Sequence, residues 1–158
     1  MRKVRGSWDK LSLDPTPTKI AICEMTMRDY SRAFELWSRS EGMGLSSADS
    51  RRAIRAYLRR NPGLSLIARC GTEVIATVLC AHDGRRGFLH HLAVARSYRR
   101  RGLGAKLVSA CLARLAAAGI EKCHIFLHAD NTYGRRFWSR RGWIAREDLV
   151  VMSSDTEA

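Results

Sequence analysis

The chain has 158 residues, of which 46% are hydrophobic, and it carries a formal net charge of +13. A chain of this length suits one domain whose core is large enough to fold without a disulfide or a structural metal. No apolar stretch reaches the roughly 20 residues of a membrane-spanning helix, and the opening MRKVRGSWDK lacks the apolar core of a signal peptide. We therefore expect a cytoplasmic protein with no membrane partner.

The cysteines favour the same compartment. Their number is odd, no two form a Cys-x-x-Cys pair, and most lie in apolar runs. Such cysteines are typical of reduced core residues, and their spacing predicts no metal site. They are Cys23, Cys70, Cys80, Cys111 and Cys123.

Most of the excess positive charge comes from arginine. It favours acidic partners: nucleic acid, a phosphate-bearing cofactor or an anionic surface. For most individual arginines, a solvated surface position explains the residue equally well. The charge alone therefore does not choose among these partners.

Hydrophobic periodicity predicts the elements in chain order. Residues 1–17 are expected to be a flexible N-terminal tail, and 18–158 a single domain. We expect a strand over 18–23, helices over 27–40 and 48–60, strands over 64–70, 73–82 and 88–94, a helix over 102–119 ended by Gly119, a strand over 122–129, a helix over 131–140 and one or two edge strands over 143–152. Three successive antiparallel strands followed by a strand–helix–strand unit predict an α/β protein with a mixed sheet.

The segment Arg99–Gly104, RRRGLG, lies where a predicted strand gives way to a helix. Its two glycines let a ligand approach the backbone closely. The first amides of a helix have no partner within the helix and carry the positive end of its dipole. Arg99, Arg100 and Arg101 add positive charge beside them. This combination predicts a site for phosphate groups.

Two common phosphate motifs do not fit this segment. A Walker A loop needs four residues between its glycines and a Ser or Thr after its lysine, whereas Gly104 follows Gly102 too closely and Lys106 has no hydroxyl neighbour. A dinucleotide fingerprint needs a third glycine where this chain has Leu107.

The segment instead matches the pattern Arg/Gln-x-x-Gly-x-Gly/Ala after a strand that ends Leu92-Ala93-Val94. A second pattern follows in the expected order: Asn131, the pair Phe137-Trp138, and then Gly142-Trp143. With both patterns on the same framework, the sequence resembles the GCN5-related N-acetyltransferases. The resemblance extends over residues 18–152 in topology and is most specific in 88–143.

This resemblance implies the GNAT acyl-CoA N-acyltransferase fold, a mixed, mostly antiparallel sheet of six to seven strands with about four helices. It also implies acetyl-CoA as cosubstrate, no metal, and direct acetyl transfer in a ternary complex to a primary amine of a small molecule, a protein N-terminus or a lysine. The pantetheine arm would lie along the strand of Leu92 and Val94, and the pyrophosphate on 99–104. The implied cofactor-binding residues are Leu92, Ala93, Val94, Arg99, Arg100, Arg101, Gly102, Leu103, Gly104, Asn131, Phe137 and Trp138.

His90 is the candidate base, because family members such as serotonin N-acetyltransferase use a histidine at the matching place for the amine. Strand alternation would put His90 on the face of Phe88 and Leu92, and His91, expected to be structural, on the other. A hydrogen-bonded core histidine is the equal alternative for His90, with His128 as a reserve base.

The proton donor departs from the family pattern. Many relatives have a tyrosine at the second aromatic position, where this chain has Trp138, whose indole N–H cannot serve as an acid. Either Tyr133 or water would protonate the thiolate, or no acid is needed. We expect Trp138 to form a wall of the coenzyme pocket.

The acceptor should be chosen by residues 41–53 and the turn 82–87, but its identity stays open, as does a homodimer. Four carboxylates could meet an ammonium group or simply be solvated: Glu41, Asp49, Glu73 and Asp83. Two other functions compete. One is a coenzyme A-binding member that turns over poorly. The other is a basic nucleic-acid-binding module, which is less favoured because aromatic residues are not interleaved with the basic stretches.

Overall fold

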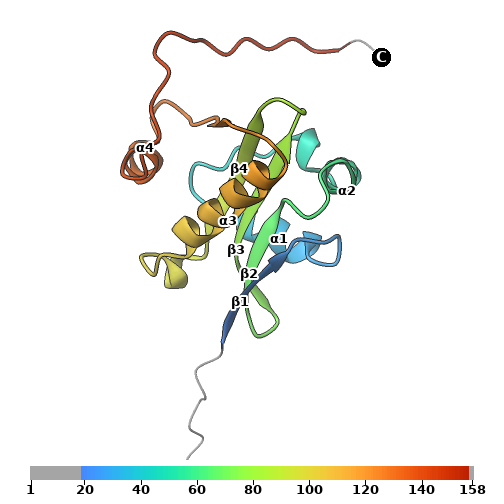
Figure 1. The fold of residues 1–158 in the computed structure, drawn as a ribbon. Helices are drawn as coiled ribbons and strands as arrows, with labels where there is room; N and C mark the ends of the chain where they lie inside the picture. Colours follow the sequence, from blue (N-terminus) through green and yellow to red (C-terminus); the bar gives the residue numbers. More distant parts are fainter. Residues whose placement is uncertain (1–18, 157–158) are drawn as a thin grey trace, which may run out of the picture.

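Five strands form one sheet in the order in which they occur along the chain (Figure 1). The computed structural model describes residues 19–156, so the tail expected at 1–17 lies outside the described residues. β1 to β4 pair antiparallel, whereas β4 and β5 are parallel, which confirms the mixed α/β fold. The strands are β1 (Ile20–Glu24), β2 (Leu66–Cys70), β3 (Glu73–His82), β4 (Gly87–Val94) and β5 (Cys123–Ile125).

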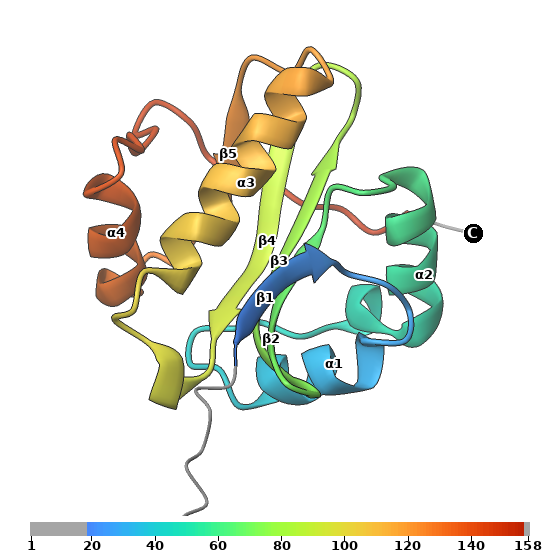
Figure 2. The same cartoon turned by 60° about the horizontal axis from the view of Figure 1, so that its bottom comes forward.

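Helices cover both faces of this sheet. One face carries α1 and α2, the other carries α3, and α4 lies beside α3 (Figure 2). No helix within residues 19–156 is long and apolar enough to cross a membrane. The helices are α1 (Tyr30–Ser38), α2 (Arg51–Arg60), α3 (Leu103–Ala117) and α4 (Thr132–Ser139), with single 3-10 turns η1 (Ser47–Asp49) before α2 and η2 (Arg96–Tyr98) before α3.

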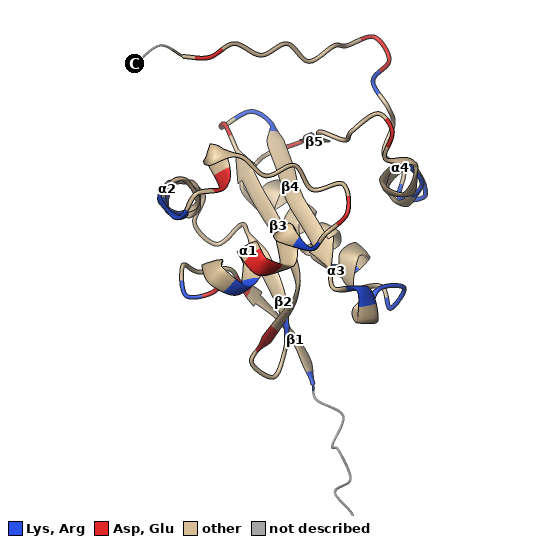
Figure 3. Cartoon of the chain, turned by 180° about the vertical axis from the view of Figure 1, so that it is seen from behind, with Lys and Arg blue, Asp and Glu red and all other residues tan. Residues whose placement is uncertain are grey.

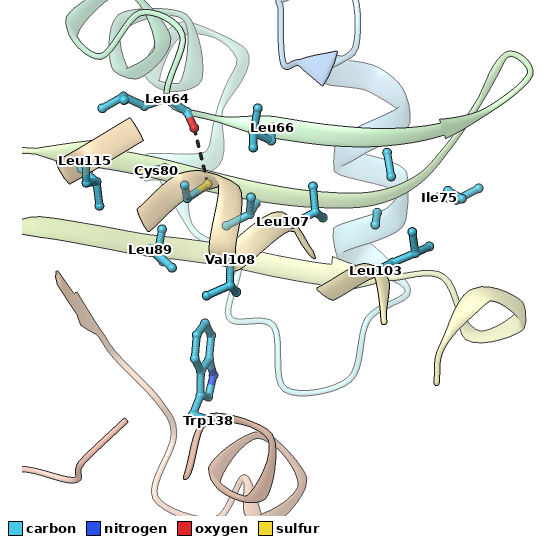
Figure 4. Close-up of a cluster of buried hydrophobic side chains, with 14 of the residues drawn as sticks. Leu64, Leu66, Ile75, Cys80, Leu89, Leu103, Leu107, Val108, Leu115 and Trp138 are labelled. Atoms are coloured by element: carbon cyan, nitrogen blue, oxygen red, sulfur yellow. Dashed lines mark hydrogen bonds between the residues drawn. The ribbon is translucent and has the colours of Figure 1, made fainter. Parts of the chain in front are cut away.

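Each face of the sheet has its own apolar core. On the α3 face, Leu107, Cys111 and Leu115 are almost fully buried, because a spacing of four residues places them on one side of the helix (Figure 4). The Cys111 thiol donates to the Leu64 carbonyl at 3.5 Å. On the opposite face, the fully buried Trp37 of α1 belongs to the second cluster.

Two glycines in the left-handed region bound α3, with φ of 76° at Gly102 and 78° at Gly119. At the C-terminal end, the Ile120 N–H donates to the Leu115 carbonyl and the Gly119 N–H to the Ala116 carbonyl, both at 2.9 Å. This is a Schellman motif, which confirms the predicted end of the helix.

Within residues 19–156 the sheet has five strands rather than the expected six to seven. The strand expected over 122–129 is limited to β5, and residues 143–152 form no strand. Arg146 and Asp148 pair with each other at 2.7 Å, and the apolar side chains of 149–152 are 58–88% exposed. An apolar run becomes a strand only beside a neighbour that exchanges hydrogen bonds with it, and this segment leads away from the sheet (Figure 1).

Candidate active site

β4 pairs with the parallel strand β5 over only the first part of its length. Its pairing with β5 ends at Leu89 and Ile125, and residues 90–94 have no strand on that side within the described chain. The backbone of this part of β4 is therefore open to an extended ligand, as at the edge of a sheet. One group there already has a partner, because Arg99 Nε donates to the Val94 carbonyl at 3.0 Å.

The open part of β4 leads into the loop before α3. Gly102 caps the helix without a side chain, and no acidic residue lies in the first turn. The amides of Leu103, Gly104 and Ala105 therefore have no side-chain acceptor, and they carry the positive end of a 15-residue helix. Leu103 itself is 5% exposed, so only its backbone can serve a ligand.

The three arginines of this loop have separate roles. Arg100 and Arg101 are exposed, and the run of arginines in this loop at the start of α3 is coloured blue in Figure 3. Arg99 instead turns toward β4, where it reaches Val94, and its guanidinium lies 3.6 Å from the Glu41 carboxylate. Two arginines, rather than the expected three, therefore face solvent beside the free amides.

Gly104 is needed for packing as well as for access. A Cβ added to it would lie 3.3 Å from the Phe137 ring and 3.7 Å from Val94. The Arg141 guanidinium lies over the same Phe137 ring, 3.6 Å from its centroid. The glycine therefore brings the start of α3 against α4, in addition to leaving space near the helix amides.

Trp138, expected to be a wall of the coenzyme pocket, is a core residue. It is 8% exposed, and its ring packs edge-on against Phe137 and Trp143, with centroids 5.1 and 4.8 Å apart. Figure 4 shows it pointing toward Val108 of α3. The tryptophan therefore attaches α4 to the core.

Asn131 caps α4, since its side-chain oxygen accepts the Gly134 N–H at 2.7 Å. It also contacts the loop that follows α1: a Cβ on Gly42 would lie 3.0 Å from Asn131 Nδ2, and one on Gly44 would lie 3.3 Å from His128 Nε2. The loop between α1 and η1 therefore reaches across to the segment that follows β5.

A β-bulge in β4 determines where the histidines lie. Thr77 pairs with Ala93 and Leu79 with His90, so β4 has one extra residue, and His91 takes the left-handed φ of 51°. The expected alternation is therefore wrong beyond His90. Both histidines lie on the α1–α2 face, whereas Leu92 packs against the core on the α3 face.

His90 packs among aromatic rings. Its ring is stacked with Phe88 and edge-on to Tyr57 of α2, with centroids 6.3 and 6.4 Å apart. Burial and, to a smaller extent, the neighbouring His91 lower the pKa of His90 below its usual value of 6.5. The imidazole is therefore neutral at pH 7 and able to accept a proton.

His91, expected to be structural, is held by a network of contacts that the strand pattern did not indicate. Its Nε2 lies 2.6 Å from Asp49 Oδ1, and its ring packs edge-on against Trp37. The Trp37 indole donates to the Thr77 hydroxyl, which donates to the His91 carbonyl, both at 2.9 Å. The Ser46-x-x-Asp49 spacing is a capping box and could have indicated that Asp49 is engaged.

The candidate acid Tyr133 and the candidate ammonium partners Asp83 and Glu41 have other surroundings. Tyr133 is 68% exposed on α4, and the side-chain oxygen of Asp83 accepts the Arg85 and Arg86 amides, which lower its pKa. Glu41 pairs with Arg96 at 3.0 Å. Residues 19–156 contain no cluster of three side chains suited to hold a metal ion.

The model of the acetyltransferase (GNAT) family matches residues 24–143 of the chain. The chain belongs to the GNAT family. The open edge of β4, the glycine-bounded start of α3 and the bulge all lie within the matched region.

Curated relatives of this GNAT protein are also acetyltransferases. N-alpha-acetyltransferase 30 of Schizosaccharomyces pombe is 27% identical over 127 residues, 77% of this chain and 75% of the relative. Mycothiol acetyltransferase of Corynebacterium aurimucosum is 36% identical over 70 residues, but these are 44% of this chain and 23% of the relative. This GNAT protein is an acetyl-CoA-dependent N-acetyltransferase.

Solved structures share the fold. Ard1 of Thermoplasma volcanium superposes with a TM-score of 0.70 at 17% identity, covering 79% of this chain and 82% of its own. PaiA N-acetyltransferase of Thermoplasma acidophilum, solved in complex with coenzyme A, has a TM-score of 0.68 at 17% identity, covering 78% and 88%. The GNAT fold is therefore confirmed for this chain, with a smaller sheet than we expected.

Proposed function

We propose that acetyl-CoA binds along the open part of β4 and that its acetyl group moves directly to a primary amine held on the α1–α2 face. The observation that carries this proposal is the continuity of two features: the backbone of residues 92–94 is open, and it leads to the free amides of Leu103, Gly104 and Ala105. An extended thioester arm fits the first feature and a pyrophosphate the second. Arg100 and Arg101 would add attraction at the rim.

His90 is the base in this proposal. The amine must lose a proton before its lone pair can attack the thioester carbonyl carbon, and a neutral imidazole can take that proton directly or through one water. Because its pKa is lowered, His90 is a weak base, and it removes a proton more readily from an ammonium group of low pKa. A peptide α-amino group, with an ordinary pKa of about 7.7–8.0, is easier to deprotonate than a lysine at about 10.4.

We therefore propose an α-amino group, such as a protein N-terminus, as the first acceptor to test. The names of the relatives support this choice, because two of the curated matches are N-alpha-acetyltransferases. A NatC complex bound to a Gag peptide and CoA also shares the fold, with a TM-score of 0.67 at 20% identity over 82% of this chain and 87% of its own. A small-molecule amine is the alternative acceptor.

The leaving group receives its proton from solvent in this proposal. As the carbon–nitrogen bond forms, the carbon–sulfur bond breaks, and the sulfur leaves as a thiolate that takes up a proton. Tyr133, the candidate acid, is 68% exposed on α4, and we therefore assign the proton to water instead. A thiol with a pKa near 8.5 is a fair leaving group at neutral pH, so bulk water is a sufficient donor.

The test is a free-thiol release assay with acetyl-CoA. One arm uses a peptide with a free N-terminus, the second uses the same peptide with a blocked N-terminus and an internal lysine, and the third uses small primary amines. We expect turnover with the free N-terminus and little with the blocked peptide. Coenzyme A binding without thiol release in any arm would instead support a family member that does not turn over.

A further inference from the structure

Aromatic side chains from three elements meet around the candidate base. We name this set the aromatic patch, and its members share the α2 side of β4 and β5: Tyr57, Phe88, His90, His124 and Phe126. Phe88 and His124 are direct partners in the parallel pairing of β4 and β5. The patch therefore lies where the two strands begin to separate.

The rings of the patch are arranged as a surface. Phe88 is stacked with His90 and with Phe126, with both centroid distances 6.3 Å, and His90 and Phe126 are 6.1 Å apart. Phe126 is 61% exposed, and the other members are half-buried. A ligand ring or apolar chain can therefore reach aromatic faces and edges here, where stacking and edge-to-face contacts are favourable.

Tyr57 contributes its ring to this surface, edge-on to His90. Its hydroxyl is buried and has no hydrogen-bond partner among the described residues. Burial strongly raises the pKa of this phenol, so it stays protonated and can donate. The thiols that act on this hydroxyl are those of Cys80, Cys111 and Cys123 in the core, so the residue presents its ring, not its hydroxyl, to an acceptor.

We propose that the aromatic patch binds the side chain next to the acceptor amine, so that the preferred acceptor carries an aromatic or large apolar group beside its primary amine. This inference rests on the proposed function. His90 is a member of the patch, so a group seated on the rings brings its own amine to the base, and ring faces attract the incoming ammonium.

The surroundings of the patch favour an uncharged side chain on the acceptor. The carboxylate that acts on His90 is that of Asp49, which is already engaged by His91 and the Ser46 amide, and α2, which supplies Tyr57, carries a series of exposed arginines, shown in blue in Figure 3. The rings offer no hydrogen-bond partner to a charged side chain, acidic or basic, so removing such a side chain from water would cost free energy there. A neutral apolar neighbour is therefore the favoured acceptor chemistry.

The test compares acceptors that differ only beside the amine. Peptides beginning with Phe, Leu, Ser or Lys form one arm, and 2-phenylethylamine against ethanolamine forms another, which separates a peptide source from a small amine. We expect kcat/KM at least about tenfold higher for the aromatic and apolar acceptors than for Ser, Lys or ethanolamine. Equal rates, or a preference for the polar acceptors while thiol is released, would overturn the inference and leave the proposed function standing.

Variants then assign the preference to the patch. Phe126→Ala should lower kcat/KM for the Phe acceptor about tenfold through KM, with little change for the Ser acceptor or for the KM of acetyl-CoA. Leu149→Ala is the matched control, because Leu149 is similarly exposed, at 58%. An equal loss with every acceptor in Phe126→Ala would contradict the assignment, whereas no thiol release from the wild-type enzyme with any amine would overturn the proposed function itself.

Discussion

His91 of β4 and Asp49 of η1 are joined through Nε2 and Oδ1 at 2.6 Å, with their side chains 15% and 7% exposed. Asp49 also accepts the Ser46 N–H through its second oxygen at 2.8 Å. This pair ties the bulge in β4 to the loop that leads into α2. The bulge in turn places His91 on the same face as His90, where the proposed acceptor binds.

Asp49→Ala should destabilise the protein by about 1–3 kcal/mol, because the His91 ring and the Ser46 amide lose a buried partner. For a domain of this size, the loss corresponds to a fall in Tm of roughly 2–4 °C per kcal/mol. Thermal unfolding measures it, with Glu147→Ala at an exposed position as control. Equal melting temperatures for the two variants would show that the pair contributes little.

His90→Gln should keep the fold and the affinity for acetyl-CoA but lower kcat by about 10²–10⁴-fold, the usual contribution of general base catalysis. Since burial lowers the pKa of His90 from 6.5, the wild-type rate should fall as pH decreases below about 6.5, and the variant should lose this acidic limb. The measurement is a pH–rate profile of wild type and variant.

The matched control for His90 is His128→Gln, since His128 is exposed and contacts the Gly44 loop instead of the patch. A His90 variant with the wild-type pH profile would eliminate His90 as base and return attention to His128.

Coenzyme A should stabilise the fold by about 2.7 kcal/mol at a concentration about 100 times its Kd. Replacing Arg100 and Arg101 together by alanine should weaken this binding several-fold at low salt, with a smaller effect at high salt, because both side chains are exposed and screened. Arg59→Ala with Arg60→Ala on α2 is the control for net charge. Calorimetric titration gives both affinities, and equal losses in the two double variants would place the phosphate elsewhere.

Gly104→Ala should change stability little, because the gain of about 1 kcal/mol from replacing a helical glycine is offset by a Cβ that presses on the Phe137 ring at 3.3 Å. Gly104→Val should lower the free energy of unfolding more than Gly104→Ala does. Its affinity for coenzyme A is therefore measured together with its stability. Phe137→Leu in the same chain should recover part of the loss, and a double-mutant cycle by urea unfolding measures this coupling. Strictly additive effects would show that the ring is not the obstacle.

Local residue patterns predicted much of the fold. The hairpin glycine between β2 and β3, the four-residue apolar spacing of α3 and the ends of that helix at Gly102 and Gly119 depend on neighbours in the chain, and each is found where it was expected. The strand expected over 143–152 shows the limit of this reasoning. Its apolar residues satisfy the pattern of a strand, but pairing requires a second segment that only the tertiary structure supplies.

The candidate site, too, has features that local residue patterns predict and features that only the tertiary structure decides. By itself, the sequence determined the mixed α/β fold, the family and the glycine and arginine loop before α3, because each follows from residues close together in the chain. The tertiary structure decided which face His90 occupies, that Asp49 binds His91, that Gly104 meets Phe137 and that Trp138 is core. These depend on a single bulge residue that inverts the side-chain alternation of a strand, and on contacts between distant residues, such as Gly104 with Phe137 and Asp49 with His91, which are 33 and 42 positions apart.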